Sequence, residues 1–539
     1  MKRLVVMMAL SGMVLALNAQ QFDNLPIPGE EKVIDNTPDS IAKALMNRPQ
    51  PGSTRQGENP VLFLIGNSTM RNGTMGNGNN GQWGWGYYAS QYFDARRITV
   101  ENQALGGMST RTFYTDLWPA VRQALKPGDW VIVSIGHNDT ADFFDQKRAR
   151  GVIPGVDPDT MVVGFNERKQ QNDTVYSYGT YLRRYICEIR AKGANPILMS
   201  LTPRNAYDEQ GKTIRKPQTG WAAYVAATEG VPFVDLNEIS GAKMDRYSSW
   251  KKNYHFFGDK IHTSKFGAEM NARSAAEGIY YSHNPQLEPL QAMMQGVEQP
   301  QYEVERQAGK PVVFITGDST VRNLDKDENG MWGWASQAGL IFDPAKIIWV
   351  NAAMAGRSTR SYIREGRWEK VYNSLQPGDY VLIQFGHNDI GEITDQRGRA
   401  SIDCTKDTCH VYLMPNGDYE LVYSFGWYLK KMIDDAREKG ATPILLSLTP
   451  RNEWPEGKIE RRNDTYGQWY REVVEETGVD FVDVHNISAD YLDKHKAKAA
   501  KYFNHDHTHT SKLGAQMNAR SVAKGLRAIN SPLANYLKK

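Results

Sequence analysis

Short apolar runs alternate with amphipathic stretches along most of the chain. In the first half, apolar runs rich in β-branched residues predict strands at 61–65, 98–102, 130–135, 196–201 and 232–236. The stretches between them have helical periodicity, and 173–193 is the clearest example. This alternation predicts an α/β fold in which a parallel sheet carries helices on both faces. In such sheets ligands bind at the carboxyl ends of the strands.

The chain also repeats itself, with an offset of about 250 residues. VLFLIGNSTMRN (from residue 61) matches VVFITGDSTVRN (from 312), and NPILMSLTPRN (from 195) matches TPILLSLTPRN (from 442). We therefore predict a tandem pair of domains with one flavodoxin-like fold. The expected divisions are a signal peptide at 1–20, a lead-in at 21–57, domain 1 at 58–284, a linker with one short helix at 285–308, domain 2 at 309–531 and a tail at 532–539.

The first residues have the pattern of a secretory signal peptide. Lys2 and Arg3 precede an apolar run over 4–17, and small residues follow near Ala19. The alternative is a membrane anchor, but the run is shorter than the roughly 20 residues that a membrane-spanning helix needs. We expect export to the periplasm or beyond it, with no stable membrane insertion after cleavage.

Composition adds little beyond the globular class. Hydrophobic residues make up 40% and charged residues 23% of the chain, and the net charge of +3 is too small to indicate nucleic acid. The three cysteines lack the paired spacing of a structural zinc site. In an exported protein Cys404 and Cys409 can pair as a disulfide, whereas Cys187 lies in an amphipathic pattern and is expected to be buried.

A serine follows the first strand of each repeat, Ser68 in G-N-S-T and Ser319 in G-D-S-T. A serine at a strand end can act as a nucleophile if a base lies near it. The alternative is a helix N-cap, a role that serine often takes. The motif also differs from the G-x-S-x-G elbow of the α/β-hydrolases.

Near the end of each repeat an aspartate precedes a histidine by three residues: Asp259 and His262, then Asp506 and His509. Such a carboxylate can bind one ring nitrogen and leave the other free to accept a proton from serine. A metal site is the alternative in the second repeat, which reads His-Asp-His-Thr-His at 505–509. The first repeat keeps only the Asp and the last His, so we predict no metal.

Two further shared motifs supply candidate hydrogen-bond donors. Asn138 and Asn388 lie in Gly-His-Asn-Asp after the third strand, where an amide group can stabilise an oxyanion. An Asx-turn is the alternative role. Gly107 and Gly356 precede Ser-Thr-Arg, and a glycine there leaves its N–H approachable.

Together these blocks resemble the SGNH, or GDSL-type, hydrolase family, and within it the rhamnogalacturonan acetylesterases. The resemblance rests on GDSTVRN, AGRSTRSY, GHND and DHTHTSKLGA and covers both repeats. It implies Ser68 and Ser319 as nucleophiles, His262 and His509 as bases, and Asp259 and Asp506 as the residues that orient them. It implies an oxyanion hole of the serine N–H, Gly107 or Gly356, and Asn138 or Asn388. No metal or organic cofactor is implied.

The first repeat departs from the family pattern, because Asn67 stands where the second repeat has Asp318. Asn can keep hydrogen-bonding although it loses the charge. The hypothesis is that domain 1 remains active. The competing hypothesis is a domain that only binds glycan.

The substrate follows less directly from the residues. Trp85 and Trp334 could stack on sugar rings or belong to the core, and Arg111 and Arg360 could bind a uronate carboxylate or form structural salt bridges. The expected partner is an acetylated polysaccharide, most simply pectic rhamnogalacturonan. Alternatives are a xylan acetylesterase, a lipase or thioesterase, and a non-catalytic glycan-binding protein.

Overall fold

Alternating side chains of the first strand enter two separate cores. The computed structural model describes residues 38–322 and 330–539, which form two compact units, the first up to Glu298 and the second from Gln299 onward except for Asp418–Glu420. The expected signal peptide lies outside the described residues. In β1 (Val61–Gly66), Phe63 belongs to one core and Leu64 to the other, as the period of two in a strand requires.

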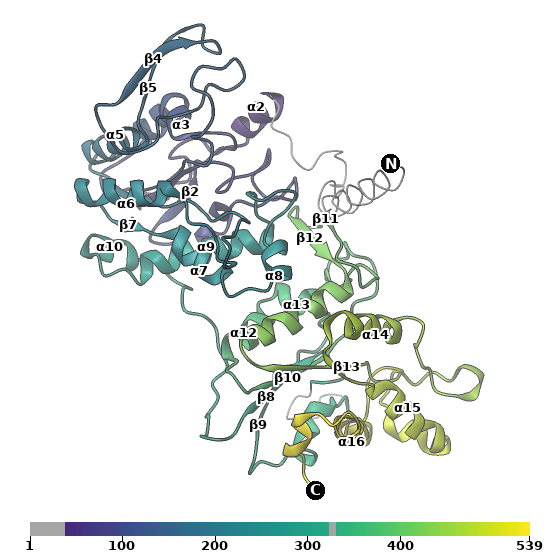
Figure 1. The fold of residues 1–539 in the computed structure, drawn as a ribbon. Coiled ribbons are helices and arrows are strands. Elements are labelled where there is room, and N and C mark those ends of the chain that lie inside the picture. Colours follow the sequence, from purple (N-terminus) through teal and green to yellow (C-terminus); the bar gives the residue numbers. More distant parts are fainter. Residues whose placement is uncertain (1–37, 323–329) are drawn as a thin grey trace, which may run out of the picture. The chain divides into compact units, whose positions relative to one another are not determined.

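The first unit contains a five-stranded parallel sheet in the order β2-β1-β3-β6-β7. Its strands are β1, β2 (Thr99–Asn102), β3 (Trp130–Ser134), β6 (Asn195–Met199) and β7 (Phe233–Val234). One face is covered by α3 (Thr110–Asp116), α4 (Trp118–Ala124), α5 (Tyr178–Ala191) and α6 (Pro217–Glu229). The other is covered by α7 (Leu236–Met244), α9 (Lys265–Tyr280) and α10 (Glu288–Gln291). Helices α2 (Pro38–Met46) and α8 (Ser249–Tyr254) complete the unit (Figure 1).

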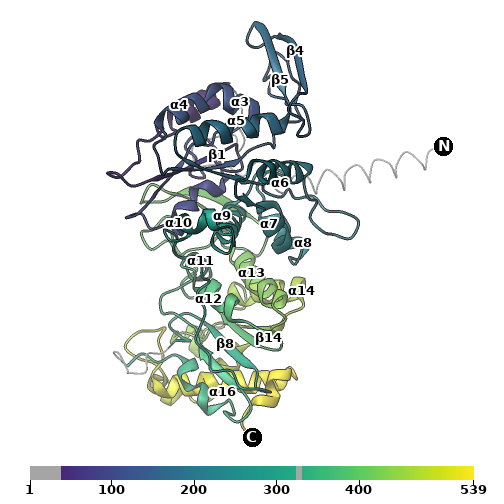
Figure 2. The same ribbon diagram turned by 90° about the vertical axis from the view of Figure 1, so that its left-hand side faces the viewer.

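The second unit repeats this arrangement in the order β14-β13-β10-β8-β9. Its strands are β8 (Val312–Gly317), β9 (Ile348–Asn351), β10 (Tyr380–Gln384), β13 (Thr442–Leu446) and β14 (Asp480–Val482). On one face lie α11 (Thr359–Arg364), α12 (Arg367–Ser374), α13 (Phe425–Glu438) and α14 (Tyr466–Thr477). On the other lie α15 (Val484–Lys494) and α16 (Lys512–Ala528), as Figure 2 shows for α16. The predicted fold class is confirmed.

Each unit also has a hairpin that the periodicity did not predict. The first joins β4 (Met161–Asn166) to β5 (Gln171–Tyr176), and the second joins β11 (Cys409–Leu413) to β12 (Tyr419–Tyr423). The helix expected over 173–193 begins only at Tyr178, because the side chain of Ser177 accepts a hydrogen bond from Thr180 N and caps it. The residues before that cap form a strand instead.

The segments expected as linker and tail belong to the packed units. Leu287 and Leu290 are buried in the first unit, and Leu533 is buried in the second. Arg306 pairs with buried Asp379 at 2.7 Å, as Arg55 of the lead-in pairs with buried Asp129 at 2.6 Å. Apolar and ionic contacts therefore extend each unit beyond its expected bounds.

The structure decides one open alternative for the cysteines and corrects one expectation. Cys404 and Cys409 are free thiols, so the structure contains no disulfide between them. Cys187 is exposed, since the buried stripe of α5 passes through Tyr185, Ile186 and Ile189 instead. In the described part of the chain, no helix has both the length and the apolar character needed to cross a membrane.

Candidate active site

Ser68 and Ser319 lie in tight turns that follow β1 and β8. In the first unit Asn67 Oδ1 accepts hydrogen bonds from Thr69 N at 3.2 Å and Thr69 Oγ1 at 3.0 Å. In the second unit Asp318 Oδ1 accepts the same pair from Thr320, both at 2.8 Å. The residue before each serine therefore holds the turn in the same way, whether it is Asn or Asp.

Each serine is hydrogen-bonded to the histidine predicted as its base. His262 Nε2 lies 2.8 Å from Ser68 Oγ, and its Nδ1 lies 2.5 Å from Asp259 Oδ2. The corresponding distances at Ser319, His509 and Asp506 are 2.9 and 2.6 Å. The chain of contacts from carboxylate to imidazole to hydroxyl is thus complete in both units.

The aspartates are held as carboxylates. Burial alone would raise the pKa of Asp259, but hydrogen bonds from the His262 ring and from the N–H groups of Ile261 and His262 outweigh burial and lower it. Asp506 is held in the same way, and its pKa falls to about 2. Each carboxylate can therefore stay charged and fix the orientation of its imidazole.

The loop that carries Asp259 and His262 is held by two hydrogen bonds to Trp83, which follows the Ser68 turn in the sequence. Trp83 N donates to Thr263 O at 2.9 Å, and Thr263 Oγ1 donates to Trp83 O at 2.7 Å. Trp332 and Thr510 make the same pair of contacts in the second unit, at 2.8 and 2.7 Å. Ser264 then caps α9, so the histidine is held immediately before a rigid helix.

The predicted oxyanion donors lie on adjoining loops. Gly107 and Gly356 have φ of +81° and +74°, in the left-handed region that glycine adopts without strain. A Cβ on neighbouring Gly106 would lie 3.7 Å from Ser68 Cβ, so this loop lies against the serine. Asn138 Nδ2 donates to Met108 O at 2.9 Å, and Asn388 Nδ2 donates to Arg357 O at 3.3 Å. One amide hydrogen thus holds the glycine loop, and the second is available for an oxyanion.

Comparison with known proteins agrees with this geometry. A model of the GDSL-like lipase/acylhydrolases matches residues 62–274, and a second model of the same group matches 315–517. The rhamnogalacturonan acetylesterase of Emericella nidulans is 33% identical over 218 residues, which are 40% of this chain and 84% of that protein. The chain belongs to the GDSL-like lipase/acylhydrolase family. The expected resemblance is confirmed, and the protein is an ester hydrolase.

Two other proteins are similar to parts of this GDSL-like hydrolase. The rhamnogalacturonan acetylesterase RhgT of Bacillus subtilis is 29% identical over 245 residues, covering 42% of this chain and 95% of its own length. The structure of Axe2, an acetylxylan esterase from Geobacillus stearothermophilus, is 24% identical, with a TM-score of 0.29 over 41% of this chain and 95% of that one.

Other residues of the GHND motif brace the GDSL-like site from within. Asp139 Oδ1 accepts from Thr110 N at 2.9 Å, and a second hydrogen bond joins its other oxygen to Thr110 Oγ1 at the start of α3. Burial raises the pKa of Asp139 to about 6 and that of Asp389 to about 7, despite these hydrogen bonds. His137 Nε2 lies 3.1 Å from Thr202 Oγ1. These side chains connect the Asn138 loop to its neighbouring loops.

Four residues expected to bind substrate are structural instead. Arg111 and Arg360 are each 1% exposed. Arg111 donates to Phe143 O and Gly151 O and pairs with Asp173 at 2.6 Å, and Arg360 donates to two backbone carbonyls in the same way. Trp85 and Trp334 are 2% and 0% exposed and belong to the cores. Their burial excludes contact with a polysaccharide and corrects this part of the prediction.

The structure instead brings two other arginine pairs to the site. Arg150 Nη1 donates to Gly107 O at 3.1 Å, and Arg399 Nη1 donates to Gly356 O at 3.2 Å and to Asn388 Oδ1 at 2.8 Å. Arg204 Nη2 donates to His137 O at 3.4 Å, and Arg451 follows the corresponding strand of the second unit. Sequence reasoning missed their role, although all four recur in the repeats, in R-A-R, R-G-R and T-P-R-N.

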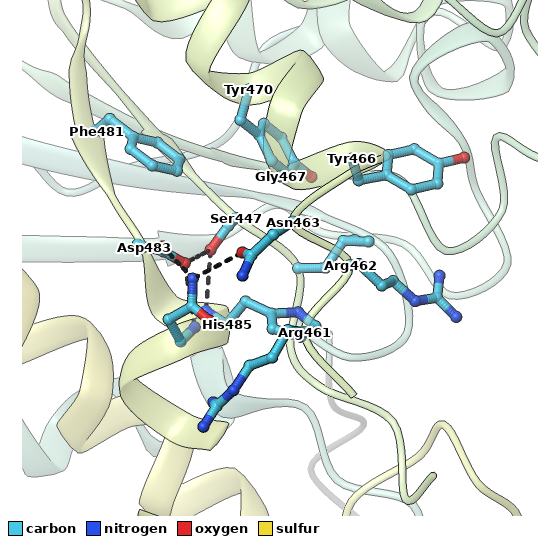
Figure 3. A pocket seen from close by; sticks show the side chains of 12 residues that line it. Ser447, Arg461, Arg462, Asn463, Tyr466, Gly467, Tyr470, Phe481, Asp483 and His485 are labelled. Carbon is cyan, nitrogen blue, oxygen red and sulfur yellow. Dashed lines mark hydrogen bonds between the residues drawn. The ribbon is translucent and has the colours of Figure 1, made fainter. Parts of the chain in front are cut away.

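Figure 3 shows a hollow in the second unit whose lining does not include Ser319, His509 or Asp506. It is lined by Ser447, Asn463, Tyr466 and Asp483, among others. Ser447 Oγ donates to Asp483 Oδ1 at 2.9 Å, and the first unit has the equivalent contact between Ser200 and Asp235 at 2.8 Å. This contact joins the end of a strand to the cap of the next helix, so we assign it to the fold. No group of three or more metal-ligating side chains occurs in the ranges that the structure describes.

Proposed function

We propose that this enzyme removes O-acetyl groups from an acidic polysaccharide, most simply the rhamnogalacturonan of pectin. The observation that carries the proposal is the complete chain of contacts from carboxylate to serine, present twice. The relatives at 33% and 29% identity are rhamnogalacturonan acetylesterases, which supports this substrate class. The expected export signal supports the proposal as well, since an exported enzyme would encounter polymeric pectin outside the cell.

In the proposed mechanism Ser68 Oγ attacks the acetyl carbonyl carbon while His262 Nε2 takes the hydroxyl proton. The carbonyl oxygen becomes an oxyanion, which the Ser68 and Gly107 N–H groups and the Asn138 amide stabilise. The sugar hydroxyl then leaves with the proton from His262, and an acetyl-serine remains. Water attacks this ester, His262 again accepts and returns the proton, and acetate is released. Ser319 and His509 act in the same way.

We also propose that both units are catalytic. Asn67 accepts the same two hydrogen bonds as Asp318. The distance from serine Oγ to histidine Nε2 is also nearly the same, 2.8 Å in the first unit and 2.9 Å in the second. The change from Asp to Asn therefore leaves the nucleophile in place. This favours an active first unit over one that only binds glycan.

The test is acetate release from acetylated rhamnogalacturonan and from acetylated xylan by wild type, Ser68→Ala, Ser319→Ala and the double variant. We expect wild type to prefer rhamnogalacturonan, each single variant to retain activity, and the double variant to lose at least about 10³-fold. Ser90→Ala, outside the candidate site, is the matched control. No release from either polymer by wild type would refute the acetylesterase proposal, and loss of all activity in Ser319→Ala alone would refute the active first unit.

A further inference from the structure

Two arginines of the first unit contact the loops that carry the candidate oxyanion donors, Arg150 at Gly107 O and Arg204 at His137 O. A Cβ placed on Gly107 would lie 3.5 Å from Arg148 Nη1 and 4.0 Å from Arg150 Nη1, so guanidinium groups lie against the loop that faces the serine. Arg204 donates to the carbonyl of His137, which precedes Asn138, and Asn205 N donates to Lys260 O in the loop of Asp259. Arg150 and Arg204 thus contact the loops that hold the candidate catalytic residues.

Neither guanidinium is paired directly with an acidic side chain of the described residues, although Asp145 and Asp139 act on Arg150, and Asp259 on Arg204, at longer range. Across residues 38–322 and 330–539, Arg150 and Arg204 have no carboxylate at ion-pair distance, and the Nε atom of each is buried without a hydrogen-bond partner. Burial lowers the pKa of both arginines despite these carboxylates, and further positive charges lie near them, Arg148 beside Arg150 and Lys216 beside Arg204. Partly buried cations without a direct ion-pair partner are costly, and an anion that binds to them would reduce this cost.

The second unit differs at the corresponding arginine. Glu453 Oε1 lies 4.0 Å from Arg451 Nη1, and the same oxygen lies 2.5 Å from His507 Nδ1. Glu453, a half-exposed carboxylate, is the residue after T-P-R-N in the second unit. The first unit has Ala206 at the corresponding position. Arg451 therefore already has an acidic neighbour, whereas Arg204 has only the Asp259 of the catalytic set.

We propose that Arg150 and Arg204 form a carboxylate-binding subsite beside Ser68, which directs the first unit to acetyl esters carried on or next to a uronic acid. In the second unit Glu453 weakens this preference, so the two units divide acidic and less acidic regions of the substrate. The planar guanidinium suits a carboxylate better than a single ammonium does, because it donates two parallel hydrogen bonds. This inference rests on the proposed esterase function and narrows its substrate.

The test uses the full chain with Ser319→Ala, so that turnover comes from Ser68. The substrates are acetylated polygalacturonate and its methyl ester, which keeps the acetyl groups and removes the negative charge. We expect a preference for the free acid in kcat/KM, and a fall of about tenfold in this preference when Arg204→Gln is added. Arg96→Gln is the control, since it removes the same charge from a residue that precedes β2, at the amino ends of the strands and away from the candidate site. Equal activity on both polymers, or a preference that Arg204→Gln leaves intact, would overturn the proposal.

The reverse change tests the second unit. In the Ser68→Ala background, Glu453→Ala places the first unit's residue beside Arg451 and should raise the preference for the free acid several-fold. A preference that stays constant would contradict the assigned role of Glu453.

A third measurement separates this proposal from the esterase proposal. If neither polymer releases acetate, hydrolysis of 4-nitrophenyl acetate by the Ser319→Ala chain still reports on Ser68. Unacetylated oligogalacturonate should inhibit that reaction, and Arg204→Gln should weaken the inhibition about tenfold. Absence of inhibition in the Ser319→Ala chain would overturn the subsite, whatever the polymer assays show.

Discussion

The aspartate before Ser319 offers a sharp test, because the first unit already contains its uncharged counterpart. Asp318 is buried, and its Oδ1 accepts from Thr320 N and Oγ1. Its Oδ2 is buried and has no hydrogen-bond partner in the described part of the chain. Asn67 Nδ2 in the first unit is likewise buried without a partner there. The substitution Asp318→Asn therefore keeps both accepted hydrogen bonds and removes only the titratable oxygen.

The effect on stability follows from the pKa. Burial raises the pKa of Asp318 from 3.8 to about 6, against the opposing hydrogen bonds from Thr320. Between these values the unfolded chain has released a proton that the folded chain retains, so the free energy of unfolding falls as pH rises. The shift corresponds to about 3 kcal/mol, fully present below pH 3.8 and lost above pH 6. Asp318→Asn removes this loss, so the variant should gain about 3 kcal/mol relative to wild type between pH 4 and 7.5.

The assay is urea unfolding of the full chain at several pH values. The transition of the second unit is assigned by the shift that Leu382→Ala causes, since Leu382 is buried in the centre of β10. Asn67→Asp is the reciprocal control and should introduce the same fall with pH into the first unit. If the free energies of unfolding of wild type and Asp318→Asn run parallel from pH 4 to 7.5, the argument is refuted.

Two further predictions concern Asn388, the candidate oxyanion donor, and Arg111, which was expected to bind substrate but is structural. In the Ser68→Ala background, Asn388→Ala should lower kcat about 10²–10³-fold with little change in KM, and a loss below threefold in acetate release would exclude Asn388 as a donor. Arg111→Met should lower the free energy of unfolding by about 2–3 kcal/mol in urea, because it removes the donor to Phe143 O and Gly151 O and leaves Asp173 with only the more distant Lys169, at 3.8 Å. An unchanged stability with a raised KM would restore Arg111 to substrate binding.

Much of this protein could be predicted from its sequence because the relevant signals are local. A strand buried on both faces needs a continuous apolar run, and a turn that presents a serine needs its own short motif. Both signals occur twice in the chain. The recurrence of Ser68 as Ser319 and of His262 as His509 therefore distinguished candidate catalytic residues from chance matches to a short motif. The fold class and the family follow from those patterns. The composition of the Ser-His-Asp sets follows too, since each serine lies at a predicted strand end and the Asp-x-x-His motif occurs in both repeats.

Other features depended on segments distant in the sequence, and only the tertiary structure decided them. Arg111 and Arg204 are both arginines of shared motifs, but the loop and hairpin residues Phe143, Gly151 and Asp173 enclose Arg111. Arg204 instead lies beside His137, where no carboxylate of the described residues is at ion-pair distance. An arginine has the same local pattern in either environment. Which carbonyls and carboxylates surround it is determined by the packing of the hairpin against α3, and that packing sets the role of each guanidinium.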